Sequence, residues 1–280
     1  MNDQQACSIE GRIGFLGAGS IVEAILSGIS KKELLSSDRI YVTNRCNSER
    51  LDLLSQTYGV HTTHDKWDVV RAADILILAM KPKDAVDALK ELAGAVHPGQ
   101  LVISVIAGVS TALIGEWLEV NGPIIRTMPN TSAAVGLSAT GLAANRFASE
   151  EQIALATRLF EAIGTVYTVA EEELDIVTGL SGSGPAYVYY LVEAMMGAGA
   201  AAGLDREMAR QLTLQTVLGA AHMLMDTREE PALLRKKVTS PGGTTQAGLE
   251  VLESYQFQKA VTSAILRATE RSREMGAQYR

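Results

Sequence analysis

A short apolar strand, a glycine-rich turn and a helix follow one another near the start of the chain. Residues 12–16 are mostly apolar, and Gly17-Ala18-Gly19-Ser20-Ile21-Val22 comes directly after them. Gly17 permits a tight turn, and Gly19 lets a pyrophosphate approach the backbone at the start of the helix. Val22 takes the place of the third glycine of the pattern and is expected to push helix and strand slightly apart. The pattern predicts a dinucleotide site whose first binding residues are Gly17, Ala18, Gly19, Ser20 and Ile21.

Short apolar runs alternate with helical stretches through the first half of the chain. We expect strands over residues 12–16, 39–43, 75–79, 101–105, 124–126 and 165–169, with helices near 48–58, 84–95 and 111–118. This alternation is typical of a doubly wound parallel sheet. Only helical patterns follow, over 171–180, 186–202, 206–226 and 232–238, from 245, and over 258–275. The expected architecture is an α/β Rossmann-like dinucleotide-binding domain over residues 1–170 and an all-α domain over 171–280.

Composition narrows the class of protein. The 280 residues suffice for two domains, and the formal net charge of −7 argues against nucleic acid as a partner. We find no basic cluster, no apolar signal segment in residues 1–10 and no apolar run of about 20 residues, so no membrane contact is expected. Cys7 and Cys46 form no CxxC pair, which suits a reducing cytoplasm. His61 and His64 have no cysteine nearby, and we expect no metal site.

The end of the second expected strand indicates which dinucleotide is bound. Enzymes that use NAD place an acidic residue there, which accepts hydrogen bonds from the ribose hydroxyls. This chain has Asn44 and Arg45 instead. A guanidinium group can hold a 2′-phosphate, so NADPH is favoured and NADH is expected to bind more weakly. The alternative is that Arg45 is an exposed loop arginine.

Three further segments leave strands at the edge where ligands of such sheets bind. Lys81 can meet a cofactor phosphate or only solvent. Small residues at the end of the strand expected over 101–105 leave room for a nicotinamide ring. Asn130 either orients the carboxamide or the substrate, or forms a turn after Pro129. The cofactor-binding residues predicted here are Asn44, Arg45, Ala79, Met80, Lys81, Pro82, Ile106, Ala107, Gly108 and Asn130.

The segment Ser240-Pro241-Gly242-Gly243-Thr244-Thr245 interrupts a helical stretch near the C-terminus. Pro241 stops a helix, and the two glycines let the backbone turn tightly. Thr244 or Thr245 is expected to cap the helix that follows. A row of backbone N–H groups at a helix N-terminus suits a small anion such as a carboxylate. The alternative is a helix corner that binds nothing.

Two other segments of the helical half are rich in glycine. In residues 179–187 we expect a kink between two helices, with Ser183 as the cap and Pro185 in the first turn. Its expected role is close packing under the nicotinamide. Glycines in residues 197–203 weaken a helix and are tolerated where another helix packs closely. That helix can belong to the same chain or to the partner in an intertwined dimer.

Several motifs together resemble the pyrroline-5-carboxylate reductase family. They are residues 179–187, 240–245 and 247–249, with the segments Arg126-Thr127-Met128-Pro129-Asn130-Thr131 and Ala79-Met80-Lys81-Pro82. The resemblance covers residues 13 to about 275. It implies reduction of 1-pyrroline-5-carboxylate to L-proline, the last step of proline biosynthesis, with NAD(P)H. It also implies a homodimer formed through the helical domain, often assembled into a decamer of five dimers. Val22 and Lys66, which stands near the expected adenosine site, depart from the pattern.

The residues agree with imine chemistry. A related carbonyl reductase would need a general acid, usually a lysine on the long helix, and residues 186–202 contain none. A protonated cyclic imine is already an electrophile, so the protein has to position it and hold its carboxylate. We expect the Gly243 and Thr244 amides to bind the carboxylate, and Thr245, the catalytic residue, to reach the ring nitrogen. The predicted substrate-binding residues are Val238, Ser240, Gly242, Gly243, Thr244 and Thr245.

Two rival hypotheses stay open at this point. The chain can be an NADPH-dependent reductase of a related cyclic imine or carbonyl compound on the same scaffold. It can also be a regulator that binds NADPH without turnover, although the complete 240–245 segment argues against this.

Overall fold

The computed structural model describes residues 9–279, so Cys7 and the expectation for residues 1–8 lie outside it. The chain divides into two compact units. The first comprises Met1–Ser183 and Leu266–Arg280, and the second comprises Gly184–Ile265. This division differs from the expected boundary at residue 170. Residues 171–183 pack on strands of the first unit, and the end of the last helix contacts other segments of that unit.

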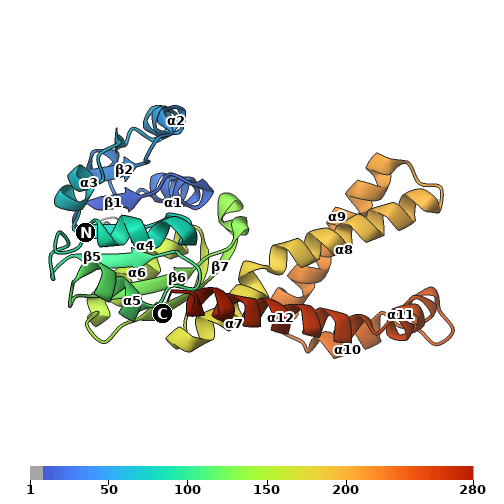
Figure 1. The fold of residues 1–280 in the computed structure, drawn as a ribbon. Helices are drawn as coiled ribbons and strands as arrows, with labels where there is room; N and C mark the ends of the chain where they lie inside the picture. The colour runs from blue at the N-terminus through green and yellow to red at the C-terminus, as the bar shows by residue number, and fades with distance from the viewer. Residues whose placement is uncertain (1–8, 280) are drawn as a thin grey trace, which may run out of the picture. The chain divides into compact units, whose positions relative to one another are not determined.

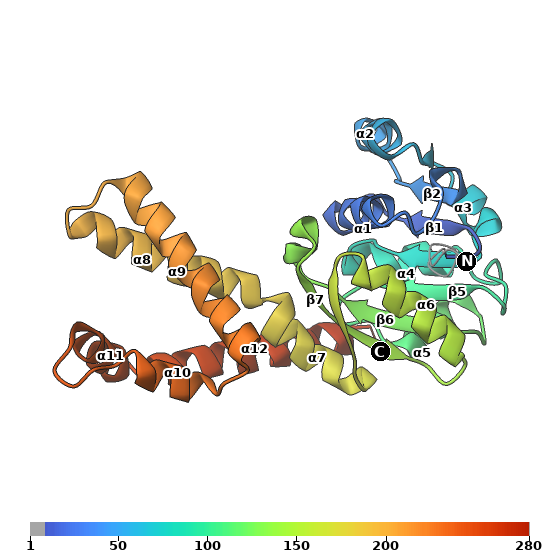
Figure 2. The same ribbon diagram turned by 180° about the vertical axis from the view of Figure 1, so that it is seen from behind.

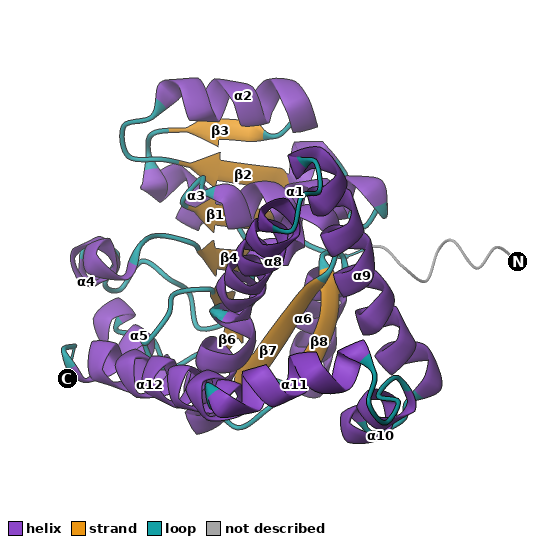
Figure 3. Cartoon of the chain, turned by 90° about the vertical axis from the view of Figure 1, so that its right-hand side faces the viewer, coloured by secondary structure: helices purple, strands orange, loops and turns teal. Residues whose placement is uncertain are grey.

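In the described part of the chain, eight strands form one sheet in the order β3-β2-β1-β4-β5-β6-β7-β8 (Figure 3, strands in orange). Neighbouring strands are parallel except β6 and β7, which are antiparallel. The strands are β1 (Ile13–Leu16), β2 (Ile40–Thr43), β3 (His61–Thr63), β4 (Ile75–Leu78), β5 (Leu101–Ser104), β6 (Ile124–Met128), β7 (Ser138–Ala144) and β8 (Gly164–Thr168). The sheet therefore confirms the predicted doubly wound fold and extends it by two unforeseen strands, β3 and β7.

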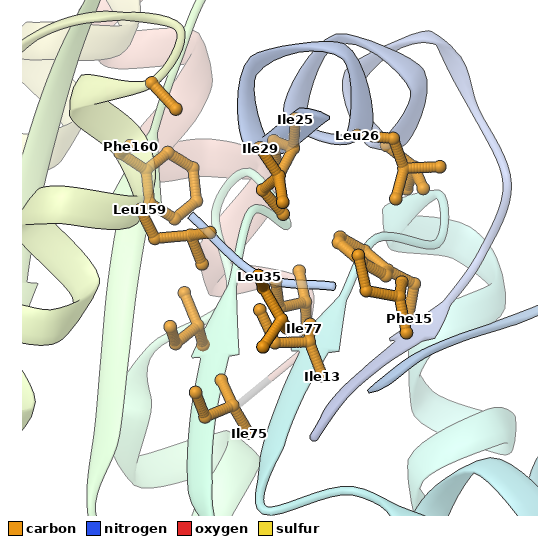
Figure 4. Packing of buried hydrophobic residues seen from close by; sticks show 14 of the residues in the cluster. Ile13, Phe15, Ile25, Leu26, Ile29, Leu35, Ile75, Ile77, Leu159 and Phe160 are labelled. Atoms are coloured by element: carbon orange, nitrogen blue, oxygen red, sulfur yellow. The ribbon is translucent and has the colours of Figure 1, made fainter. Parts of the chain in front are cut away.

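Helices cover both faces of this sheet (Figures 1 and 2). They are α1 (Ser20–Lys31), α2 (Ser48–Tyr58), α3 (Lys66–Ala72), α4 (Pro82–Lys90), α5 (Thr111–Leu118) and α6 (Glu150–Glu161). Side chains of α1, α2 and α6 share one core cluster, and those of α3, α4 and α5 share the other. Within β4, Ile75 and Ile77 enter the first cluster while Leu76 and Leu78 enter the second, as the twofold periodicity of a strand requires. Figure 4 shows Ile25 and Ile29 of α1 above Ile13 and Ile77.

The segment after β8 explains why the first unit extends beyond residue 170. It contains the 3₁₀ turn η4 (Glu171–Glu173), α7 (Leu174–Val177) and the π-helical turn η5 (Thr178–Gly182). Two further 3₁₀ turns, η2 (Ser37–Arg39) and η3 (Thr131–Val135), occur earlier in the chain. The residues of α7 contact β6 and β7. Near the C-terminus, Ser272 donates to Asp175 over 2.6 Å, and Tyr279 lies edge-on to Trp117. These contacts place residues 266–279 with the sheet.

The second unit contains α8 (Gly184–Ala201), α9 (Arg206–Thr227), α10 (Pro231–Lys237), α11 (Thr244–Ser254) and the first part of α12 (Phe257–Ala277). No strand occurs in the described residues 171–279, which confirms the all-α prediction for that range. Gly199 of α8 lies so close to α9 that an added Cβ would be 3.1 Å from the Cβ of Ala209. This residue therefore serves a contact within the chain, whereas a Cβ on Gly197 would meet nothing within 4 Å.

The second unit has almost no interior of its own. Of its described residues, only Ala209 and Thr213 are buried. Its large exposed apolar side chains include Tyr189, Tyr190, Leu212, Leu218, Met225, Val251 and Tyr255. Apolar surface of this extent marks an interface with another protein surface. Over the described residues, no helix is long and apolar enough to cross a bilayer.

Candidate functional site

The carboxyl ends of β2, β1, β4, β5 and β6 lie at one edge of the sheet, because these strands are parallel neighbours. β1 pairs with β2 on one side and with β4 on the other, so the strand order reverses beside β1. Ligands of open α/β sheets bind at such a reversal. The segments that the sequence assigns to the cofactor all follow these strands, and the topology brings them to the same edge.

Gly17 and Gly19 have different structural requirements. Gly17 has a φ of +124°, and an added Cβ would lie 2.4 Å from the carbonyl oxygen of Ala79. Gly19 is the N-cap of α1, with φ −76°, and an added Cβ there would meet nothing within 4 Å. The space over Gly19 and the first amides of α1 therefore suits a pyrophosphate group. Val22 is fully buried in the core beside them.

Arg50 of α2 holds this glycine turn from the neighbouring element. Its Nε donates to the carbonyl oxygen of Ala18 over 2.8 Å, and its Nη2 lies 3.4 Å from the carbonyl oxygen of Gly19 and 2.6 Å from Glu23 Oε2. The Arg50 side chain is 20% exposed. Sequence reasoning did not find this role, because residues 32 positions apart in the chain meet only once β1 and β2 pair.

The loop after β2 is closed by two sets of hydrogen bonds. Asn44 Oδ1 accepts from the amides of Cys46 and Asn47 over 3.2 and 2.9 Å. The main-chain oxygen of Asn44 lies 2.7 Å from His64 Nδ1, and His64 Nε2 lies 3.0 Å from Ser48 Oγ. Arg45 is exposed at the tip of this loop. The Asn44 side chain thus shapes the loop that presents Arg45.

Lys66 forms an ion pair with Glu91. The pKa of the Glu91 carboxyl lies below its ordinary value, first because Lys66 donates a hydrogen bond to it and then because of the positive charges of Lys66 and Arg45. Lys66 is therefore a partner of Glu91 and opens α3. This ion pair gives Lys66 a structural role.

The remaining predicted cofactor segments meet the same edge in different ways. Lys81 is the exposed N-cap of α4, and Pro82 is its first residue. Gly108, with φ +77°, lies against α12, since an added Cβ would be 3.1 Å from the Gly276 amide nitrogen. Its small size is therefore needed by the chain itself as well as by the expected nicotinamide ring.

Asn130 has partners for both ends of its carboxamide. Its Oδ1 accepts from the Ser132 amide over 3.0 Å, and its Nδ2 donates to the Ser181 carbonyl oxygen over 3.1 Å. The residue caps η3 and ties it to η5. This geometry favours the turn-forming interpretation of Asn130 over an orienting role.

The expectation for residues 179–187 is wrong in one detail. Ser183 has helical dihedral angles, φ −86° and ψ −18°, so it does not have the extended backbone of an N-cap. The segment passes through a π-helical turn, in which an added Cβ on Gly182 would lie 2.9 Å from Met128 Cε. Gly182 thus packs closely against the end of β6, and the packing expected under the nicotinamide stays a prediction.

The 240–245 segment forms a tight turn at the start of α11, with Gly242 at φ +71°. The N-cap is Gly243 rather than Thr244 or Thr245, so the cap residue has no side chain to bond the helix. The Gly242 amide donates instead to Gln246 Oε1 over 2.8 Å, and the Gly243 amide donates to the Ser240 carbonyl over 3.0 Å. The expectation that the Gly243 amide is free for a carboxylate is therefore not met.

Two amides stay available at this helix start. Within the described residues, the amides of Thr244 and Thr245 and the Thr245 hydroxyl have no hydrogen-bond partner. Both threonines are exposed, and Val238 is 67% exposed. Two such amides can hold a carboxylate, and a hydroxyl, which both donates and accepts, can bond a neighbouring polar atom. The described residues contain no cluster of His, Cys, Asp or Glu that could hold a metal ion.

Comparison with known proteins identifies the family. A family model described as "Pyrroline-5-carboxylate reductase dimerisation" matches residues 171–275, and one described as "NADP oxidoreductase coenzyme F420-dependent" matches residues 12–108. Pyrroline-5-carboxylate reductase 1 of Bacillus subtilis is 45% identical over 264 residues, which cover 94% of this chain and 89% of that protein. The chain belongs to the pyrroline-5-carboxylate reductase family.

Solved structures agree with this membership. A pyrroline-5-carboxylate reductase from Coxiella burnetii is 39% identical, with a TM-score of 0.87 over 95% of this chain and 98% of that one. The Plasmodium falciparum pyrroline carboxylate reductase, solved with NADP bound, is 27% identical with a TM-score of 0.87 over 96% and 99% of the chains. The chain is thus an NAD(P)H-dependent oxidoreductase that reduces a C=N bond, and its helical half is a dimerisation domain.

Proposed function

We propose that this pyrroline-5-carboxylate reductase binds 1-pyrroline-5-carboxylate at the N-terminus of α11. The observation that carries the proposal is the group of unpartnered polar atoms there, the Thr244 and Thr245 amides and the Thr245 hydroxyl. The two amides hold the substrate carboxylate, where the partial positive charge of the 11-residue helix α11 adds to their attraction. The Thr245 hydroxyl oxygen accepts a hydrogen bond from the protonated ring nitrogen. Gly242 and Gly243 keep the turn tight, and Ser240 accepts the bond that closes it.

The cofactor occupies the edge of the sheet beside β1 in this proposal. NADPH supplies the hydride that adds to the carbon of the protonated imine. The ring nitrogen keeps the proton it already carries, and the product is L-proline. Gly19 and the first amides of α1 hold the pyrophosphate, and Arg45 pairs with the 2′-phosphate. The cleared space over Gly19 and the absence of an acidic residue at position 44 or 45 support this placement. NADH, which lacks the 2′-phosphate, binds more weakly.

Oligomer and location complete the proposal. A homodimer formed through residues 171–275 is the smallest active unit, and assembly of five such dimers into a decamer is the further state implied by the family. The cytoplasm, where reduced cysteines persist, is the proposed compartment.

The test is oxidation of NADPH, followed at about 340 nm, with 1-pyrroline-5-carboxylate and with a panel of other cyclic imines and carbonyl compounds. The proposal expects turnover of 1-pyrroline-5-carboxylate with the highest kcat/KM of the panel. Higher kcat/KM for another imine would support the rival reductase. Tight binding of NADPH without turnover of any compound would support the rival regulator.

A further inference from the structure

His64 connects the two sides of the loop that carries Arg45. It follows β3 directly, and its two ring nitrogens contact the main-chain oxygen of Asn44 and the hydroxyl of Ser48 over 2.7 and 3.0 Å. Asn44 precedes Arg45, and Ser48 is the first residue of α2. The side chains of Arg45, Ser48 and His64 are all exposed, so a bound group can reach each of them.

The contact with Asn44 fixes which ring nitrogen carries a proton. A carbonyl oxygen only accepts, so Nδ1 of His64 is the donor. In the neutral ring Nε2 is then an acceptor, and the Ser48 hydroxyl donates its proton to it. The Ser48 oxygen is left with lone pairs toward solvent, which are poor partners for an acceptor-only phosphate.

Uptake of a second proton by the ring reverses this bond. Nε2–H then donates to Ser48 Oγ, and the Ser48 hydroxyl proton becomes free to donate to a phosphate oxygen. The ring also gains a positive charge beside Arg45. Proton uptake from solvent and binding of a phosphate thus favour each other.

Other charged groups surround His64 on the elements next to it. Arg45 lies in the β2–α2 loop, Glu49 is in the first turn of α2, and Asp65 and Lys66 open α3. Asp65 Oδ1 accepts from the Trp67 amide over 2.8 Å, and Lys66 is paired with Glu91. Among the described residues, the hydrogen bonds of the His64 ring go to neutral groups, Asn44 and Ser48.

We propose that His64 is a positioning residue that sets the selectivity for NADPH over NADH. It holds the Asn44 main chain, and through its proton it turns the Ser48 hydroxyl toward the 2′-phosphate. The inference rests on the proposed position of the 2′-phosphate beside Arg45. NADH offers a ribose hydroxyl there, which both donates and accepts, so its binding does not depend on the proton of His64.

The test measures dissociation constants of NADPH and NADH by calorimetry on the intact protein, without substrate, between about pH 6 and pH 8. In the unmodified protein, the ratio of NADPH to NADH affinity should rise about five- to tenfold as pH falls, the effect of one gained hydrogen bond. His64→Gln, which cannot take up a proton, and Ser48→Ala should lower the ratio at pH 6 by a similar factor and flatten its pH profile. His61→Ala, on the strand that precedes His64 and stacked on Tyr41, is the matched control and should keep both.

The double variant His64→Gln/Ser48→Ala should lose no more selectivity than either single variant, because the two side chains act in series. Unchanged ratios in His64→Gln, or equal weakening of both cofactors at every pH, would overturn the proposal.

Arg45→Ala shows whether the role of His64 or the position of the 2′-phosphate has failed. If it lowers the ratio while His64→Gln does not, only the role of His64 fails; if neither variant changes the ratio, the 2′-phosphate is not at this loop and both assignments fail. Because the readout compares two cofactors on one protein, partial unfolding cannot imitate it.

Discussion

Arg50 of α2 donates from Nε to the main-chain oxygen of Ala18 over 2.8 Å, so the helix after β2 fixes the turn after β1. The guanidinium is also held by Glu23, which lies one turn into α1. The position of the turn that we propose for the pyrophosphate thus depends on a residue from the next βα unit.

We predict that Arg50→Ala weakens NADPH and NADH alike, by about tenfold, since a hydrogen bond from a charged group contributes about 1.5 kcal/mol or more. Titration of both cofactors into the variant checks this. Arg71→Ala is the control, because Arg71 pairs with Asp68 on the exposed surface of α3. Weakening confined to NADPH would contradict the prediction and place Arg50 at the 2′-phosphate.

The two glycines of the first turn should respond differently to alanine. Gly17→Ala combines a left-handed φ of +124° with a Cβ 2.4 Å from the Ala79 oxygen, so we expect a loss of about 2 kcal/mol or more of unfolding free energy. Gly19→Ala meets no neighbour and should keep its stability, while its Cβ obstructs the pyrophosphate and raises the KM for NADPH. Thermal unfolding and cofactor kinetics on both variants separate the two roles. Equal melting temperatures for the pair would contradict this account.

Glu171 joins three groups from two other elements. It accepts from the Thr111 amide and hydroxyl, each over 2.7 Å, and from Arg126 Nη1 over 3.0 Å. Glu171→Ala leaves the guanidinium of Arg126, which is 9% exposed, without its charged partner. We expect a loss of about 2 kcal/mol in urea unfolding, below the cost for a fully buried pair because Glu171 is part-exposed. Glu270→Ala removes an exposed pair with Arg267 and should lower the unfolding free energy much less. Similar losses for both variants would count against this role.

The structure also shows where sequence patterns lacked information. Residues 61–63 form a strand, but it is three residues long, polar and at the edge of the sheet, so its hydrophobic pattern is weak. β7 consists mostly of small residues and is recognisable only by its partners β6 and β8. By contrast, the start of α6 has a recognisable sequence signal, because Ser149 and Gln152 form a capping box.

The predicted site was limited by local hydrogen bonds that the sequence does not specify. A threonine after Gly-Gly is a plausible cap by composition, yet Gln246 reaches back to the Gly242 amide and makes a threonine cap unnecessary. The roles of Arg50 and His64 depend on pairing of β1, β2 and β3. The binding segments therefore stay predictions from motifs, while the fold shows which hydrogen-bond partners their residues have.

The helical unit should not exist as a folded monomer. With only Ala209 and Thr213 buried among its described residues, it needs apolar surface from a second copy. We predict that the smallest folded species in light scattering is a dimer, and that dilution below the dimer dissociation constant lowers helical circular dichroism. A folded, active monomer over the whole dilution series would contradict this prediction.

The central claim is that the start of α11 binds the substrate and that the Thr245 hydroxyl meets its ring nitrogen. The decisive measurement is kcat/KM for 1-pyrroline-5-carboxylate at saturating NADPH in Thr245→Ala and Thr245→Ser, with exposed Thr57→Ala of α2 as the matched control. Thr245→Ala should lower kcat/KM about tenfold or more, the contribution of one oriented hydrogen bond. Thr245→Ser should keep most of the activity, and both variants should retain NADPH affinity and melting temperature, because Thr245 is not the helix cap. A Thr245→Ala protein with the kcat/KM of the unmodified chain would contradict the claim.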